Sequence, residues 1–110
     1  MSAAINELYA HLSAQAKLHR AVANAVLADG ARLFAYPLER GVLLALGAAP
    51  GKYLRAEMLL RRRGADLRRF GAWLPSLFND GSWYLVRRCA DSEAQGLDEA
   101  EWLAAEELLR

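Results

Sequence analysis

Apolar positions in the first quarter of the chain recur every three to four residues, the spacing of one face of an α-helix. The members of this stripe are Ile5, Leu8, Leu12, Ala16, His19, Val22 and Val26. Many alanines between them favour helix. Gly30 can adopt the left-handed conformation that ends a helix. The pattern therefore predicts a single helix over residues 3–28.

Two short apolar runs that follow predict a β-hairpin. Residues 32–36 and 42–46 are rich in aliphatic and aromatic side chains, and the loop between them contains Pro37 and Gly41. Both faces of the second run are apolar, which is typical of a central strand or of a face reserved for a partner.

A second hairpin is predicted around Asn79-Asp80-Gly81, a strong turn signal between apolar runs. Pro75 places the run over residues 73–78 at a sheet edge or bulge. Alternation in the run after the turn places four residues on one face and three on the other. The first face carries Trp83, Leu85, Arg87 and Cys89, and the second carries Tyr84, Val86 and Arg88.

Helical patterns lie between and after the hairpins. Residues 52–63 form the middle helix, Gly64 interrupts it, and residues 65–71 continue it with Leu67 and Phe70 inward. The last helix begins at Asp98, where Asp98 and Glu101 match a capping box. The predicted order is α-β-β-α-β-β-α, an α+β domain with helices packed on an antiparallel sheet.

Composition limits the protein class. With 110 residues and 55% hydrophobic content, residues 1–110 form one folded domain. A single cysteine excludes an internal disulfide. The longest apolar stretch is about half of the roughly 20 residues that span a bilayer. We see no signal peptide and expect a cytoplasmic protein without membrane insertion.

Charge is segregated along the chain, although the net charge is only +1. Residues 52–69 hold seven bases and two acids, whereas residues 91–110 hold seven acids and one base. A general polyanion binder would be strongly basic. The two segments instead suit each other, within one chain or across a dimer.

No segment carries recognisable catalytic or metal chemistry. The stretch Gly47–Tyr53 resembles a phosphate loop, but its glycine spacing is one residue short and Tyr53 replaces the hydroxyl residue. His11 and His19 have no further ligand at metal-binding spacing. Cys89 has no base in its own motif. We therefore expect no enzyme, no catalytic or metal residues and no cofactor.

The basic stretch around Gly64 offers the alternative of a small nucleic-acid-binding regulator. Its candidate phosphate contacts are Arg61, Arg62, Arg63, Arg68 and Arg69. A helix-turn-helix reader requires two packed helices, but hairpins flank this stretch. A solvated helix face, or a face for an acidic partner, explains the arginines better, so nucleic acid is not the expected partner.

The second half of the chain resembles the class I type III secretion chaperones, the Tir-chaperone-like family. The matching features are a helix over Leu54–Leu67, the Asn79-Asp80-Gly81 turn, the strand Trp83–Arg87 and a final helix over Leu97–Leu109. Family members typically have three strands before the middle helix, whereas the pattern here predicts two.

This resemblance implies a small, non-enzymatic, cytoplasmic dimer of bacterial virulence systems. Such proteins hold a segment of a secreted protein, or of another secretion component, in extended form, and here the role is chaperoning or regulation. The partner is then a protein, and pairing is homo- or heterodimeric. We expect client binding at Leu33, Phe34, Tyr36, Val42, Leu44, Leu46, Trp83 and Leu85. We expect the dimer interface at Leu54, Met58, Leu59 and Leu67.

Overall fold

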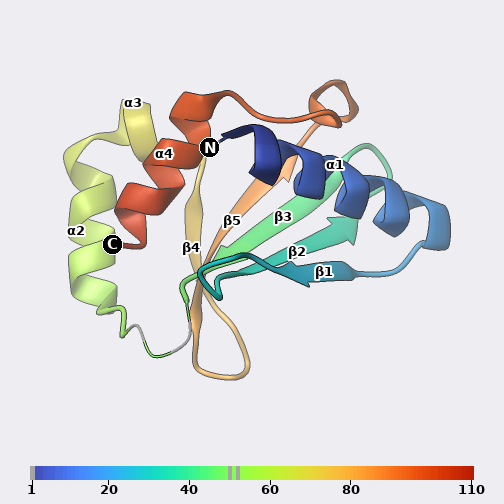
Figure 1. Ribbon diagram of the computed structural model, residues 1–110. Helices are drawn as coiled ribbons and strands as arrows, with labels where there is room; N and C mark the ends of the chain where they lie inside the picture. Colours follow the sequence, from blue (N-terminus) through green and yellow to red (C-terminus); the bar gives the residue numbers. More distant parts are fainter. Residues whose placement is uncertain (1, 50, 52) are drawn as a thin grey trace.

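The protein is built from one antiparallel sheet with helices packed on one of its faces (Figure 1). The computed structural model describes residues 2–49, 51 and 53–110. Its elements are α1 (Ser2–His19), β1 (Ala23–Val26), β2 (Arg32–Pro37), β3 (Val42–Gly47), α2 (Ala56–Ala65), α3 (Leu67–Phe70), β4 (Leu74–Leu77), β5 (Trp83–Cys89), η1 (Asp91–Glu93) and α4 (Glu99–Leu108). The α+β class is therefore confirmed, with one more strand than the predicted order contains.

Strand order in the sheet is β1-β2-β3-β5-β4, and every neighbouring pair is antiparallel. β3 lies in the middle, which accounts for its apolar residues on both faces. β4 lies at an edge of the sheet, a position that tolerates Pro75 because only one side of the strand is paired. Both predicted hairpins are confirmed, as β2–β3 and β4–β5.

The predicted single helix over residues 3–28 is wrong. α1 ends at His19, and Arg20 adopts a left-handed conformation with φ of 52°. The chain then turns back, and Ala23–Val26 pairs with β2 as an edge strand. Helix propensity in this alanine-rich stretch is overridden by the backbone hydrogen bonds that β2 offers. Gly30, with φ of 90°, serves the β1–β2 turn instead of ending a helix.

The middle helix also breaks at a different place from the predicted one. Gly64 lies within α2, and the interruption falls at Asp66, whose side chain accepts a hydrogen bond from the Arg69 amide at 3.2 Å. This bond starts the short helix α3. Phe70 is buried as predicted, but Leu67 is 56% exposed.

The core lies between the helices and the face of the sheet that they cover. α1 packs on β1, β2 and β3, and α4 lies beside it over the same face (Figure 1). The largest fully buried side chain is Trp73, whose indole N–H donates to the Glu101 carbonyl at 2.9 Å. Its ring centre lies 6.0 Å from that of Trp102, which in turn meets Tyr9 edge-on. These aromatic rings join α4 and α1 to the sheet.

An ion network lies where α4 meets β5. The Arg87 guanidinium contacts the carboxylates of Glu101 and, at 3.0 Å, of Glu93, and lies over the Trp73 ring. Burial alone lowers the pKa of Arg87, but the charges of Glu101 and Glu93 outweigh burial, and the pKa is raised. Because Glu101 binds Arg87, the predicted capping box does not form, although Asp98 is the N-cap residue.

The opposite face of the sheet, which we call the open face, carries a row of apolar side chains. Register and alternation place Val26, Phe34, Tyr36, Leu43, Tyr84 and Val86 on it, together with Arg32 and Arg88. The Tyr84 ring lies over Gly47, where a Cβ atom would come within 2.5 Å of it. Phe34 and Phe78 pack against this ring. The aromatic residues therefore cover one another and part of the sheet.

Candidate functional site

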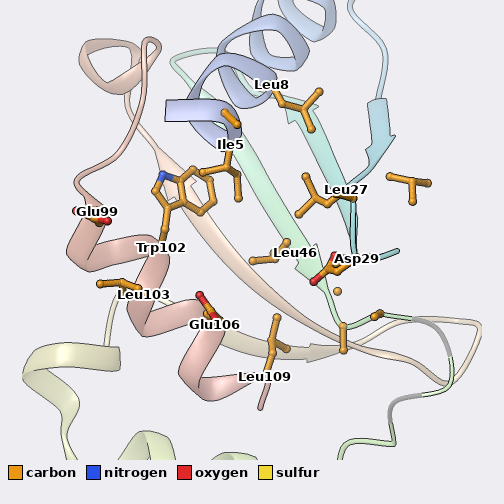
Figure 2. A pocket seen from close by; sticks show the side chains of 17 residues that line it. Ile5, Leu8, Leu27, Asp29, Leu46, Glu99, Trp102, Leu103, Glu106 and Leu109 are labelled. Carbon is orange, nitrogen blue, oxygen red and sulfur yellow. Dashed lines mark hydrogen bonds between the residues drawn. The ribbon is translucent and has the colours of Figure 1, made fainter. Parts of the chain in front are cut away.

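An apolar groove lies between α1 and α4 (Figure 2). Its volume is about 560 Å³, within the usual range for binding sites. Residues from both helices, from the β1–β2 turn and from the end of β3 line it. They are Ala4, Ile5, Leu8, Val26, Leu27, Ala28, Asp29, Ala31, Leu46, Gly47, Ala48, Ala49, Glu99, Trp102, Leu103, Glu106 and Leu109.

Large apolar side chains make the inner surface of the groove. Ile5 extends from α1 toward Trp102 of α4, Leu8 lies further along α1, and Leu46 lies below them on β3 (Figure 2). Leu27 faces them from the end of β1, so the groove has apolar walls on three sides. Leucines and isoleucines left half-buried beside an unfilled space lose packing contacts that a ligand would restore.

Asn6 fixes the distance between the two helical walls. Its side-chain oxygen accepts hydrogen bonds from the Leu97 amide at 2.9 Å and from the Trp102 indole at 2.8 Å. Its side-chain nitrogen donates to the Leu97 carbonyl at 3.1 Å. Gly96 lets the loop come close, since a Cβ atom there would lie 2.6 Å from the Asn6 side chain. The groove is therefore held open by a defined set of bonds rather than by loose packing.

The charged residues at the groove are all acidic within the described residues. Asp29 comes from the β1–β2 turn, and Glu99 and Glu106 come from α4. Figure 2 shows Asp29 and Glu106 on opposite sides of Leu46. All three residues are exposed. One oxygen of Asp29 accepts a hydrogen bond from the Ala31 amide at 2.9 Å within the turn, which leaves its other oxygen available to a ligand. The groove thus combines an apolar surface with a negative rim.

The eight predicted client-binding residues divide between the core and the open face. Leu33, Val42, Leu44, Leu46 and Leu85 are buried, and Trp83 packs against the core. Phe34 and Tyr36 lie on the open face and are partly exposed. Leu46 alone of the eight lines the groove. Alternation along each strand is visible in the sequence, but the face that the helices cover is not.

The four predicted interface residues are also divided. Leu59 is buried in the core, and Leu54 packs against it. Met58 and Leu67 are 45% and 56% exposed. These two side chains, one on α2 and one on α3, are the members of the set that a second subunit can reach.

Most of the basic stretch has partners inside the molecule. Arg61 pairs with Glu57, and Arg69 pairs with Glu107. Arg62 donates to the carbonyls of Glu107, Leu108 and Arg110, which end α4, and Arg63 donates to those of Trp73 and Gly71. Arg68 is exposed. These contacts give the stretch a structural role, which joins the basic and acidic segments within one chain.

The remaining candidates for chemistry lie apart from one another. Cys89 is fully buried beside Tyr9, and burial raises the pKa of its thiol. His11 and His19 are exposed on α1. Within the described residues no group of acids, histidines and cysteine is arranged to hold a metal ion. In the loop that resembles a phosphate site, Pro50 and Lys52 lie outside the described residues.

Sequence reasoning missed the groove because it forms between segments far apart in the chain. The sequence places Ile5 and Leu8 on one helix stripe and Trp102 at the start of another helix, but nothing local shows that these stripes face each other.

None of the helices in the described residues has an apolar run long enough to cross a bilayer. No family model, curated protein or solved structure matches the chain.

Proposed function

We propose that this protein is a non-enzymatic binding protein, a chaperone or regulator of a bacterial type III secretion system, that holds a segment of another protein in the groove between α1 and α4. The observation that carries the proposal is the apolar surface of Ile5, Leu8 and Leu27, which is left half-buried beside the groove. The ring of Trp102 is buried beneath it and bonded to Asn6. A segment that buries apolar side chains there would be kept from aggregating.

The order of elements supports the secretion-chaperone part of the proposal. Because β1 is a strand, three strands precede the middle helix α2, as in the family that the second half resembles. β1 is also a sheet edge beside the groove, since its last residue, Val26, and the next residue, Leu27, both belong to the groove lining. An extended client can therefore add main-chain hydrogen bonds at this edge while its side chains enter the groove.

The same proposal includes pairing of two subunits through the middle helices. Met58 and Leu67 are exposed apolar side chains on α2 and α3. Glu57 and Arg61 pair with each other on α2, so a partner helix would meet no unbalanced charge from them. Pairing through these residues leaves the groove accessible, because neither Met58 nor Leu67 lines it.

A filled-groove variant tests the proposal. Ala4 lines the groove and is exposed, so Ala4→Trp would place an indole in the space without removing a core contact. The matched control is Ala3→Trp, one position away and outside the lining. Each variant is co-expressed with the proteins encoded beside its gene, and complexes are measured by light scattering. We expect Ala4→Trp alone to lose its partner; equal complex formation by both variants would contradict the proposal.

A further inference from the structure

We propose that the segment bound in the groove is basic as well as apolar, and that Asp29, Glu99 and Glu106 bind lysine or arginine side chains on either side of its apolar residues. This inference rests on the proposed function and names the chemistry of the partner. It commits to a polypeptide from another protein as the occupant.

Charge complementarity carries the inference. The groove has acids on both of its long sides, and no basic residue lines it in the part of the chain that is described. Glu99 and Glu106 are seven residues apart on α4, about 10.5 Å along the helix axis. An extended segment covers that distance in about three residues. Side chains of an extended segment alternate between its two sides, so two basic residues about two or four positions apart would point toward α4 together and reach both carboxylates.

The acidic side chains also make the groove less suitable for other classes of apolar ligand. Fatty acids and phospholipids carry their negative charge next to the apolar chain, so their headgroups would meet the carboxylates of the rim. A neutral apolar segment would leave the three carboxylates without a partner of opposite charge but would not be repelled. A basic, apolar segment satisfies both features of the groove, and basic flanks also keep such a segment soluble before it binds.

A second copy of the chain is a weaker match. Four of the five arginines between Arg61 and Arg69 already have partners within their own subunit. To enter the groove of another copy, these side chains would have to give up contacts within α2, to the segment before β4 and to the end of α4. The bases at the groove are therefore expected to come from a different protein.

A displayed library of random peptides tests the inference and requires no identified client. Peptides of about 12 residues suffice, since an extended chain of that length crosses the longest dimension of the molecule, 37 Å. The library is selected on the wild-type protein, on a variant with Asp29→Lys and Glu106→Lys, and on a control with Glu7→Lys and Glu39→Lys. The control changes the net charge equally at exposed acids outside the groove.

We expect wild type and control to enrich peptides that combine large apolar residues with lysine or arginine. The Asp29/Glu106 variant should bind these peptides at least tenfold more weakly and should enrich acidic peptides instead. Binders that Ala4→Trp blocks but that show no basic preference would overturn this inference and leave the proposed function standing. No binders, or binders that Ala4→Trp does not affect, would overturn both. A dimer of the wild-type protein that Ala4→Trp dissociates would assign the groove to a second copy and would also overturn the inference.

Discussion

A small number of half-buried polar side chains determine how the two helical walls meet. Asn6 is half-buried on α1 and makes three hydrogen bonds to the Leu97 main chain and the Trp102 indole. Arg87 joins β5 to α4 and to the η1 turn through Glu101 and Glu93. Apolar packing brings α1 and α4 onto the sheet, and these polar bonds determine the distance between the two helices. The shape of the groove is thus set by single residues.

Replacing Asn6 with alanine should therefore cost about 2–3 kcal/mol of the free energy of unfolding. The substitution leaves the Leu97 main chain and the Trp102 N–H without their partners, and buried groups left unpaired are more costly than an average hydrogen bond. Chemical denaturation followed by tryptophan fluorescence measures the loss. Gln15→Ala, an exposed polar residue of the same helix, is the control and should change stability by less than about 0.5 kcal/mol.

Stability should also decline in alkaline solution. Burial raises the pKa of the Cys89 thiol, and burial with the charge of Cys89 raises that of the Tyr9 hydroxyl above its usual range. Both groups therefore keep their protons to higher pH in the folded protein than in the unfolded chain, where they ionise near pH 8.5 and pH 10 respectively. The unfolded state then binds fewer protons, so the free energy of unfolding falls as pH rises, by up to about 1.4 kcal/mol per pH unit for each group.

Urea unfolding at intervals between pH 7 and pH 11 measures this decline. Cys89→Ala lowers stability at every pH through the lost packing, but it should remove the part of the slope that begins near pH 8.5. A slope that is the same in wild type and Cys89→Ala would show that the thiol ionises equally in both states.

At the scale of the elements, the packing of α2 against α4 explains why arginines are concentrated in α2. The Arg62 guanidinium donates to the carbonyl of Glu107 at 2.8 Å and to those of Leu108 and Arg110. Carbonyls at the end of a helix have no partners within the helix and carry its partial negative charge. One arginine of α2 therefore caps the C-terminal end of α4 and holds the two helices together.

Arg62→Met should lower the free energy of unfolding by about 1.5–3 kcal/mol, the usual contribution of hydrogen bonds from a charged group. Methionine keeps the aliphatic part of the side chain, so the loss reports on the guanidinium. Arg68→Met is the matched control, because Arg68 is exposed on α3, and it should change stability by less than about 0.5 kcal/mol. Equal losses in the two variants would contradict the role assigned to Arg62.

How much of this arrangement the sequence predicts depends on how local its causes are. The Asn79-Asp80-Gly81 turn and the apolar runs beside it predicted the β4–β5 hairpin, because turn geometry is determined by adjacent residues. β1 was missed because its alanines favour helix, and its strand structure comes from pairing with β2. The groove was missed for the same reason: Leu8 and Trp102 line one groove only in the folded chain.

Across the whole molecule, the helices cover one face of the sheet and leave several apolar surfaces, three of which bear on binding. The groove lies between α1 and α4, the open face carries Phe34 and Tyr36, and α2 and α3 expose Met58 and Leu67. A client in the groove and a second subunit at α2 and α3 occupy two of these surfaces without overlap. Binding of a client and pairing of subunits are therefore expected to be separable by mutation.

Light scattering on the purified protein tests the pairing. We expect a dimer for the wild type and a monomer for the variant with Met58→Glu and Leu67→Glu, since charges at these positions would have to be desolvated in the interface. Leu18→Glu is the control, because Leu18 is 77% exposed on α1, away from both α2 and the groove lining. The oligomeric state of Leu18→Glu should remain that of the wild type. Wild-type protein that stays monomeric would rule out self-pairing through α2 and α3.

Nuclear magnetic resonance can show residue by residue whether a polypeptide segment binds between α1 and α4. A peptide selected on the wild-type protein is titrated into ¹⁵N-labelled protein, and the indole N–H signals of the three tryptophans are followed. The signal of Trp102, which lines the groove, should shift most, together with the amides of Ile5, Leu8 and Leu27. Shifts confined to Phe34, Tyr36 and their neighbours on the open face would contradict binding in the groove.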